Sequence, residues 1–391
     1  MNQTTIQPRL LASGLPTPCY ILDEEKLIAN GKILKKLQDE TGCKILLAQK
    51  AFSNYHLYPV LAPYLAGTEA SGLFEARLGA EEMSGKECHV FCAAYREEDF
   101  DELLLYADHI VFNSPAQLKK FGVRAKNAGK EIGIRINPEC STQEGHAIYD
   151  PCAPGSRLGT TLAQWQKEMT PEFVALLDGI HFHTLCEQNS DALEQTLQSV
   201  EQNFGFILER VKWLNMGGGH HITREDYDID RLKHLIHHMQ TNYHLEIYLE
   251  PGEAVALNAG FLLTRVLDVV TNGNTSIAIH DMSPACHTPD VIEMPYRPPL
   301  FSSGEAKKKA YTYRLAGPTC LAGDVVGDYS FDAPLSEGDL LLYEDMAIYS
   351  TCKNNTFNGM PLPDIRVAKC DGSYKLLARF GYEDFKYRLG K

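Results

Sequence analysis

Three polar side chains follow short apolar runs of the sequence, where buried strands would end. Lys50 follows "KILLAQ", His183 closes "GIHFH", and Glu250 follows "EIYL". An amine, an imidazole and a carboxylate are groups that serve nucleophilic and acid–base catalysis. Burial beside a strand would also lower the pKa of a lysine and bring its amine closer to the neutral nucleophile. These residues predict a catalytic site at strand ends, although each one alone also fits an ordinary strand-end polar residue.

A run of three glycines stands in "NMGGGHH", after another apolar run. Without side chains, Gly217, Gly218 and Gly219 let the backbone approach an anion and turn several N–H groups toward it. The run is neither G-x-G-x-x-G nor a Walker A loop, so dinucleotide or ATP binding is poorly supported. The sequence therefore indicates a phosphate-type turn, with a tight turn that binds nothing as the alternative.

Two further charged residues, Glu69 and Arg135, belong to the same set of strand ends. Among the group, Glu250 could hold a proton on a heteroaromatic nitrogen, because a nearby negative charge favours the protonated cation. The imidazole of His183 could lie flat against a planar cofactor, or it could be a histidine satisfied inside the fold. "HFHT" has no third ligand with supporting spacing, and the helically spaced histidines of 231–244 fit a solvated helix face better than a metal site, so we expect no metal.

The elements that must position these residues alternate between strand-like and helical patterns. Apolar strand-like runs occur at 44–48, 89–93, 109–112, 132–136, 179–184, 213–217 and 246–251, with amphipathic stretches such as 24–40 and 191–210 between them. Strand and helix in repeated alternation predict parallel βαβ units, and this many units over about 250 residues predict a (β/α)8 TIM-type barrel. Active sites of such barrels lie at the C-terminal ends of the strands. Lys44 opens the first of these runs, at the opposite end of the barrel, and is expected to be structural.

The pattern changes after about residue 270. Short strands separated by Gly, Pro, Asn and Asp predict a mostly antiparallel β-barrel or sandwich domain. We therefore expect a barrel domain over 24–270 and a β domain formed by 1–23 and 271–391, with the strand in "PTPCYIL" (16–22) joining the β domain. A chain of 391 residues also suggests two domains by its length.

The β domain contributes its own polar residues. Cys320 and Asp324 stand in the Gly/Pro-rich "LAGPTCLAGDV", and Tyr349 is expected to end a strand in "DMAIYS". The cysteine could donate a proton and the tyrosine could reach a phosphate. The polar set of "HDMSPACHTPDVIEMP" could bind amino and carboxylate groups, and it includes His287, Asp290 and Glu293. A structural cysteine and an ordinary acidic loop are the alternatives.

Composition excludes several classes of protein. The net charge of −14 argues against nucleic-acid binding, which needs a basic surface. The eleven cysteines are an odd number without a C-x-x-C pair, which favours reduced thiols in the cytoplasm. No apolar run approaches the ~18 residues of a membrane span, and the N-terminus lacks the pattern of a signal peptide.

Nine motifs, in order along the chain, carry a family resemblance: "AQKAF", "SGLFEARLG", "IRINPE", "SRLG", "HFHT", "GGG", "EPGE", "GPTC" and "MAIY". The chain resembles the alanine racemase-like, fold type III enzymes that use pyridoxal phosphate (PLP), which include ornithine and diaminopimelate decarboxylases. In "HTLCEQ", "NMGGGHH", "EPGEA", "ACHTPDVIEMPYRP" and "GPTCLAGD" it is most similar to the members that decarboxylate carboxylated polyamines.

The resemblance implies a role for each position. Lys50 would bond covalently to PLP, His183 would stack on its ring with Arg135 behind, and Glu69 would lie near the attachment point. Glu250 would pair with the pyridine nitrogen, while Gly217, Gly218, Gly219 and Tyr349 would hold the phosphate. Cys320 would enter the active site of the neighbouring subunit, which implies a homodimer.

Two departures bear on the substrate. Ornithine and diaminopimelate decarboxylases have Arg after "EPG", where this chain has Glu253, and "CLAGD" replaces the "CESGD" of diaminopimelate decarboxylases. Both changes argue against those substrates and leave the phosphate site one cation short. The cationic arm of a polyamine would be bound by acidic and polar residues, for which we consider Glu253, His287, Asp290, Glu293 and Asp324. Another basic amino acid as substrate, racemisation, and an inactive regulatory relative remain as alternatives.

Overall fold

The computed structural model describes residues 6–143 and 149–390. The chain forms two compact units, of which one holds residues 28–255 and the other residues 1–27 and 256–391. These bounds differ from the predicted ones, because residue 270 falls inside a long strand, β10 (Gly260–Asn272), that belongs to the sheet of the second unit.

The first unit is a closed barrel of parallel strands. Its strands are β2 (Lys44–Ala48), β3 (Gly67–Ala70), β4 (Glu87–Phe91), β5 (His109–Phe112), β6 (Glu131–Arg135), β7 (Gly179–His181), β8 (Trp213–Asn215) and β9 (Glu246–Leu249). Each strand pairs in parallel with the next, and β2 pairs with β9 to close the barrel. The predicted TIM-type barrel is confirmed. The strand that the sequence patterns missed is β3, since "GTEA" has no apolar run.

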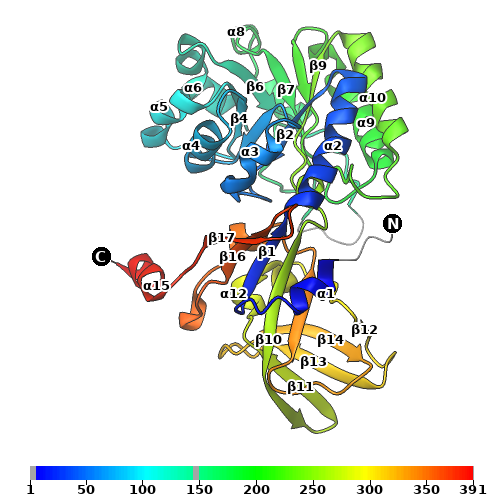
Figure 1. Cartoon of the computed structure of the whole chain (residues 1–391). Coiled ribbons are helices and arrows are strands. Elements are labelled where there is room, and N and C mark those ends of the chain that lie inside the picture. Colours follow the sequence, from blue (N-terminus) through cyan, green and yellow to red (C-terminus); the bar gives the residue numbers. More distant parts are fainter. Residues whose placement is uncertain (1–5, 144–148, 391) are drawn as a thin grey trace. The chain divides into compact units, whose positions relative to one another are not determined.

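Helices surround these strands (Figure 1). They are α2 (Glu24–Thr41), α3 (Tyr58–Leu61), α4 (Leu73–Glu82), α5 (Glu97–Tyr106), α6 (Pro115–Asn127), α7 (Leu162–Glu168), α8 (Pro171–Val174), α9 (Ser190–Leu208), α10 (Ile229–Tyr243) and α11 (Glu253–Ala256), with a 3-10 turn, η1, at Tyr55–Leu57. Local signals set their ends. Ser114 accepts a hydrogen bond from the Gln117 N–H and Pro115 follows it, which is a favourable start for α6.

The interior of the barrel is filled by side chains rather than open. Trp213 lies against β6 and β7, where a Cβ atom on Gly133 or Gly179 would come within 2.4 or 1.9 Å of the indole. Only glycine at these two positions leaves room for the ring. Leu46, Val111 and Tyr248 pack with Trp213 in the same buried cluster. The barrel is therefore a packed core that supports a rigid rim.

The second unit is built on a mostly antiparallel sheet, in agreement with the prediction. Its strands are β1 (Cys19–Asp23), β10, β11 (Thr275–His280), β12 (Gly304–Glu305), β13 (Tyr311–Ala316), β14 (Val325–Phe331), β15 (Leu340–Glu344), β16 (Asp364–Ala368) and β17 (Tyr374–Ala378). They follow the order β12-β14-β13-β11-β10-β1-β16-β17, with β15 also pairing with β10. Thus β1 lies between β10 and β16, and the pairs β1–β16 and β11–β13 are parallel.

Short helices complete the second unit. They are α1 (Ile6–Leu11), α12 (Pro284–His287), α13 (Asp290–Glu293), α14 (Ser350–Lys353), η3 (Phe357–Gly359) and α15 (Tyr382–Leu389). All eleven cysteines are free thiols. Among the described helices of the chain, none is long and apolar enough to cross a membrane.

Candidate active site at the C-terminal end of the barrel

Lys50 lies just past the end of β2, at the C-terminal end of the barrel. Its Nζ is 3.8 Å from Oε2 of Glu69 on β3, and its side chain is 37% exposed. Burial raises the pKa of Glu69 to about 8, despite the nearby Lys50 charge. A carboxyl group with that pKa is largely protonated at neutral pH, so the contact is not a firm ion pair. The Lys50 amine therefore remains accessible for chemistry.

Glu250 follows β9 and is held by two side chains inside the barrel. Its Oε2 accepts a hydrogen bond from Nε2 of His181 at 3.2 Å, and its Oε1 accepts one from Nδ2 of Asn215 at 2.5 Å. Burial alone would raise the pKa of Glu250, but the hydrogen bond and charge at His181 and the charge of Lys50 bring it below its ordinary value. Glu250 is therefore ionised at neutral pH. Each of its oxygens can still accept one further hydrogen bond.

Arg135 and His183 are adjacent across the ends of β6 and β7. Nη2 of Arg135 donates to the backbone carbonyl of His183 at 3.0 Å, and its guanidinium lies 4.6 Å from the centre of the Phe91 ring. Burial lowers the pKa of Arg135 to about 10, which leaves the side chain charged at neutral pH. Burial, together with the charges of Lys50 and Arg135, lowers the pKa of His183 well below its ordinary value. The ring of His183 is therefore neutral.

The glycine turn after β8 packs closely against both neighbouring strand ends. The N–H of Gly218 donates to Nδ1 of His183 at 3.1 Å, which places the ring proton of His183 on Nε2. Gly217 and Gly219 have φ angles of 69° and 82°, in the region that favours glycine. A Cβ atom on Gly218 would lie 2.5 Å from the carbonyl oxygen of Glu250. The close packing explains all three glycines, and within the described residues the Gly219 N–H donates no hydrogen bond.

Glu253, at the position where the sequence resemblance places arginine in ornithine and diaminopimelate decarboxylases, is paired with a histidine. It is the first residue of α11, and its Oε2 lies 2.8 Å from Nε2 of His221. His221 is the second residue after the glycine turn, and its side chain is nearly buried. The position thus carries a carboxylate–imidazole pair where related decarboxylases carry a guanidinium. The sequence predicted Glu253 but not its partner.

In the second unit, the loop between β13 and β14 presents Cys320. The thiol-bearing residue is exposed, and its N–H donates to Oδ1 of Asn358 at 2.7 Å. Asp324 is buried at the base of the same loop, where its oxygens accept hydrogen bonds from Ser283, Ala285 and Thr319. Through these hydrogen bonds Asp324 holds the loop in shape. This is a structural role, and it differs from the predicted contact with the substrate.

Of the remaining predicted residues, His287 also has a structural role, because both of its ring nitrogens form hydrogen bonds within the second unit. It is fully buried, its Nδ1 accepts from the Ser283 N–H at 3.2 Å, and its Nε2 donates to the carbonyl of Pro361 at 3.0 Å. Burial lowers its pKa to about 4. By contrast, Asp290 and Glu293 on α13 both bind the Lys353 ammonium group, so their charges are already partly balanced.

The sequence pattern predicted that Tyr349 ends a strand, and this prediction is wrong. β15 ends at Glu344, and Tyr349 stands before α14 with a φ of 54°. A tyrosine with a left-handed backbone is uncommon, which marks this as a shaped turn rather than a continued strand. Tyr349 and Asp290 line the same small hollow of the second unit, together with Thr288, Tyr296 and Ile348.

Sequence reasoning missed several residues that the barrel brings together. His181 is the first residue of "HFHT", but its partner Glu250 lies 69 positions further along the chain. Asn215 precedes the glycine turn and also donates from its side chain to Glu250, although no motif drew attention to it. A third group, Glu87, His89 and His109, forms a cluster of possible metal ligands within the barrel, which the sequence search for metal sites did not find.

Comparison with known proteins identifies the family to which this chain belongs. Residues 19–347 match the family described as pyridoxal-dependent decarboxylase, C-terminal sheet domain. The chain belongs to this family of pyridoxal-dependent decarboxylases. The protein is a PLP-dependent carboxy-lyase, and the family resemblance seen in the sequence motifs is confirmed.

Individual relatives align over nearly the whole chain. Carboxyaminopropylagmatine decarboxylase of Synechocystis sp. is 42% identical over 98% of this chain and 97% of its own length. Carboxynorspermidine/carboxyspermidine decarboxylase of Campylobacter jejuni is 37% identical over 96% of this chain and 98% of its own. The crystal structure of the C. jejuni carboxynorspermidine decarboxylase with norspermidine superposes with a TM-score of 0.88 at 36% identity, covering 96% of this chain and 100% of that one. The closer resemblance indicated by the sequence was to this enzyme, and it is confirmed.

The barrel residues fit PLP on their own geometry. Lys50 offers an accessible amine, and Oε2 of Glu69 beside it is buried without a hydrogen-bond partner among the described residues. Glu250 offers an ionised carboxylate with spare acceptor capacity for a pyridine N–H. The Gly219 N–H is an available donor for a phosphate oxygen. Amine, carboxylate and amide donors thus lie at one end of one barrel, as this cofactor requires.

Proposed function

We propose that the protein decarboxylates carboxynorspermidine and carboxyspermidine, yielding norspermidine and spermidine in polyamine biosynthesis. The observation that carries this proposal is the near-complete match to the C. jejuni structure that holds norspermidine. Relatives of that name, from C. jejuni and from Herminiimonas arsenicoxydans, are 37% and 32% identical over at least 95% of this chain. The replacement of the family's arginine by Glu253 also supports a substrate that differs from ornithine and diaminopimelate.

Carboxyaminopropylagmatine is a second candidate substrate. The Synechocystis relative, at 42% identity, carries the name carboxyaminopropylagmatine decarboxylase. The substrates share a carboxylated aminopropyl group and differ in the amine to which it is joined. Agmatine ends in a guanidinium group, whereas the other two end in an ammonium group. A planar guanidinium binds a carboxylate through two parallel hydrogen bonds, so the acidic residues around the distal end decide between them.

The barrel residues have distinct tasks in the proposed reaction. Bound PLP supplies the electron sink that accepts the electron pair left when CO2 departs. Lys50 would hold the cofactor through its amine, which is the group that the α-amine of the substrate would replace. Glu250 holds a proton at the pyridine nitrogen, because its ionised carboxylate favours the cation there. His181 and Asn215 act as positioning residues, since they fix the carboxylate of Glu250 from within the barrel.

Other residues orient the cofactor and finish the reaction. The neutral ring of His183 would lie against the face of the cofactor, and Arg135 holds the backbone of His183 in place. The turn Gly217–Gly219 and Tyr349 would bind the phosphate. Cys320 provides the proton that replaces CO2 on the substrate carbon. The exposure of Cys320 supports a role in a homodimer, where each subunit contributes this loop to the active site of its partner.

Acidic residues would select the cationic end of the substrate. Glu253 lies beside the glycine turn, and its pairing with His221 leaves one carboxylate oxygen for an ammonium group. In the second unit, Asp290 and Glu293 would exchange Lys353 for the substrate amine. Asp324 and His287 would act indirectly, by holding the loop and helix that carry the contacts. The free thiols and the relatives' small-molecule chemistry support a cytoplasmic location, with no nucleic acid or membrane as partner.

A substrate panel tests the proposal. The purified PLP-bound enzyme is mixed separately with carboxynorspermidine, carboxyspermidine, carboxyaminopropylagmatine, ornithine and diaminopimelate, and CO2 release gives kcat/KM for each. We expect the highest kcat/KM for one of the three carboxylated polyamines. A preference for ornithine or diaminopimelate would refute the substrate assignment, and chiral analysis of the recovered amino acid would reveal racemisation. Lys50→Ala serves as the inactive control.

A further inference from the structure

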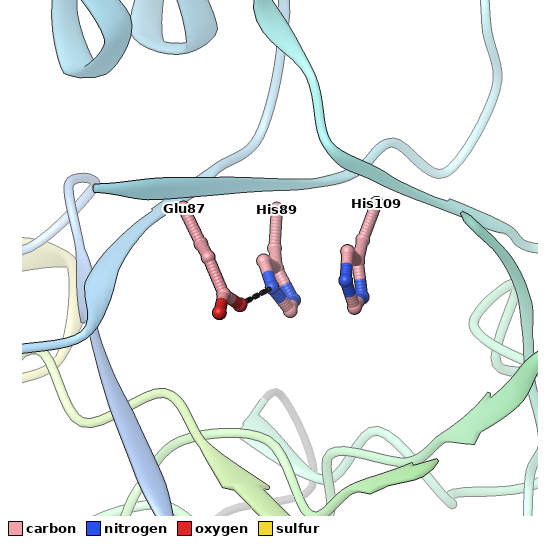
Figure 2. A group of neighbouring side chains, drawn as sticks. All are labelled: Glu87, His89 and His109. Atoms are coloured by element: carbon pink, nitrogen blue, oxygen red, sulfur yellow. Dashed lines mark hydrogen bonds and ion pairs between the residues drawn. The ribbon is translucent and has the colours of Figure 1, made fainter. Parts of the chain in front are cut away.

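A group of two histidines and a glutamate lies inside the barrel, away from Lys50. Glu87 and His89 are on β4, where residues two apart point to the same side, and His109 is on β5 directly opposite His89. Figure 2 shows the three side chains projecting together into the barrel, with the imidazole rings facing each other. The ring centres are 3.8 Å apart and the ring planes differ by 21°. The three residues each offer one ligand atom, and these atoms lie within 4.8 Å of one another.

The histidine nitrogens in this group are incompletely satisfied. Nε2 of His89 lies 3.0 Å from Oε2 of Glu87, and Nε2 of His109 lies 3.8 Å from Oε2 of Glu131. Both Nδ1 atoms are buried and have no hydrogen-bond partner within the described residues. In each ring, Nδ1 is therefore a nitrogen that no described residue engages. Buried polar atoms without a partner are costly, and two of them side by side, next to a carboxylate, point to a ligand that binds ring nitrogens.

From this cluster we propose that Glu87, His89 and His109 form a binding site for one divalent transition-metal ion, of the zinc, cobalt or nickel class. Two imidazoles and a carboxylate are a donor set that suits these ions and suits magnesium or calcium poorly. The site is separate from the PLP-binding residues and does not depend on the proposed substrate. Its role is structural, since the ion joins β4 to β5 through side chains in the barrel interior.

The surrounding charges favour a cation. Lys44 pairs with Glu87 at 2.6 Å and with Glu246 at 2.9 Å, and Glu131 adds a third carboxylate beside His109. Among these contacting residues, three carboxylates face one ammonium group. Lys44 also donates to the hydroxyl of Tyr248 at 3.0 Å. It can therefore keep Glu246 and Tyr248 as partners when Glu87 turns to the ion.

The geometry also defines how the site must change. Bonds of about 2.0–2.2 Å to zinc require ligand atoms closer together than the present 4.8 Å limit. The imidazole rings must rotate out of their stacked arrangement so that both lone pairs meet at one point. The side chains of Glu87, Lys44 and Glu246 are 30%, 32% and 44% exposed, so the ion has a path from solvent.

Trp213 supplies an optical reporter for the test. Its ring centre lies 5.1 Å from that of His109, and the chain has only one other tryptophan, Trp165. In the variant Trp165→Phe, all tryptophan emission comes from Trp213. Holoenzyme stripped with a chelator is titrated with CoCl2, which quenches nearby indole emission, and with ZnCl2 in a calorimeter. We expect one equivalent of tight binding per chain, quenched Trp213 emission and a raised melting temperature with Zn2+.

Matched variants separate this site from others that bind metals. His89→Gln and His109→Gln should weaken the tight equivalent by at least about 10–100-fold. Glu87→Gln, at a partly exposed position where misfolding is less of a concern, should weaken it as well. His237→Gln on the exposed face of α10 should leave it unchanged, and so should Glu187→Gln beside the pair His221–Glu253. The proposal is overturned if the stripped holoenzyme binds no Co2+ near Trp213, or if folded His89→Gln and Glu87→Gln bind both ions as tightly as the unchanged protein.

Discussion

The two ends of the barrel use the same kinds of residue in opposite ways. At the N-terminal end, Lys44 contacts Glu87, Glu246 and the Tyr248 hydroxyl, and these carboxylates, with the bonds they form, raise its pKa despite the opposing effect of burial. At the C-terminal end, Lys50 has one ion-pair contact among the described residues, at 3.8 Å to Glu69. The two lysines stand at opposite ends of the short strand β2.

The difference shows how a fold distinguishes a structural lysine from a reactive one. Several close carboxylates hold an ammonium group in its charged form and occupy its donors. A single carboxyl group that burial keeps protonated leaves the amine free to react. The carboxylates differ in the same sense, because Glu87 has close contacts with both Lys44 and His89, whereas Glu69 has only the 3.8 Å contact with Lys50 among the described residues.

Replacing either lysine by alanine should affect catalysis at one position and only stability at the other. Lys50→Ala should abolish CO2 release and the visible absorbance of the lysine-bound cofactor, because no other amine takes its place. Lys44→Ala should keep both and lower the melting temperature by no more than about 4 °C, since surface-type ion pairs contribute little. Absorbance spectra, CO2 capture and thermal melts check this. Retained turnover in Lys50→Ala would disprove the catalytic assignment.

The two ends of β9 provide a second matched pair. Glu250→Gln should retain PLP but reduce kcat by roughly 10²–10³-fold, because a neutral amide no longer stabilises a protonated pyridine nitrogen. Glu246→Gln, at the start of the same strand, should leave kcat unchanged. Single-turnover CO2 release with either variant measures the effect. Near-normal turnover in Glu250→Gln would show that the pyridine nitrogen does not need this carboxylate.

Glu69 should make the cofactor-free protein less stable as pH rises. Its folded pKa of about 8 lies above the ordinary value of 4.5, so the folded state binds more protons than the unfolded state between these values. The free energy of unfolding therefore falls as pH rises from about 4.5, and the loss is complete above about 8. Relative to the unchanged protein, Glu69→Gln should gain melting temperature over that range and no further above it. A difference that shrinks with rising pH would contradict a protonated Glu69.

Glu87 should show the opposite and smaller dependence on pH. Burial opposes its ionisation, but hydrogen bonds and charges from His89 and Lys44 lower its pKa to about 2. Its stabilising effect is present above the ordinary value of 4.5 and is lost as pH falls toward 2. Glu87→Gln should therefore melt below the unchanged protein at neutral pH, by at most about 4 °C, and the two melting curves should converge in acid. A constant difference across that range would argue against the pairing.

The sequence predicted the barrel well where strands are buried on both faces. The bounds of β2 and β5 match the runs "KILLA" and "HIVF", because continuous apolar runs leave little choice of register. β3 was missed as a run because "GTEA" is small and polar. Its Gly67 is forced by close packing, since a Cβ atom there would lie 2.0 Å from the carbonyl oxygen of Glu87. Such a constraint arises only when neighbouring strands are in place.

The individual groups of the candidate site were easier to predict than their partners. Motif positions gave Lys50, Glu250 and the glycine turn. They could not give the hydrogen bonds of His181 and Asn215 to Glu250, which depend on barrel closure. The pairing of His89 with His109 likewise follows from the register of β4 and β5. Tyr349 shows a further limit, because its left-handed backbone interrupts a pattern that otherwise predicts a strand.

The position of β1 in its sheet has a consequence for how the protein is made. Residues 19–23 leave the ribosome early, yet one edge of β1 pairs with residues 364–368, near the other end of the chain. The barrel segment is complete long before that partner exists. Until β16 is synthesised, β1 presents an unprotected strand edge, the kind of edge to which other chains can add. Ribosomal pausing or truncation before residue 364 would therefore prolong an aggregation-prone state while leaving the sequence of the catalytic barrel intact.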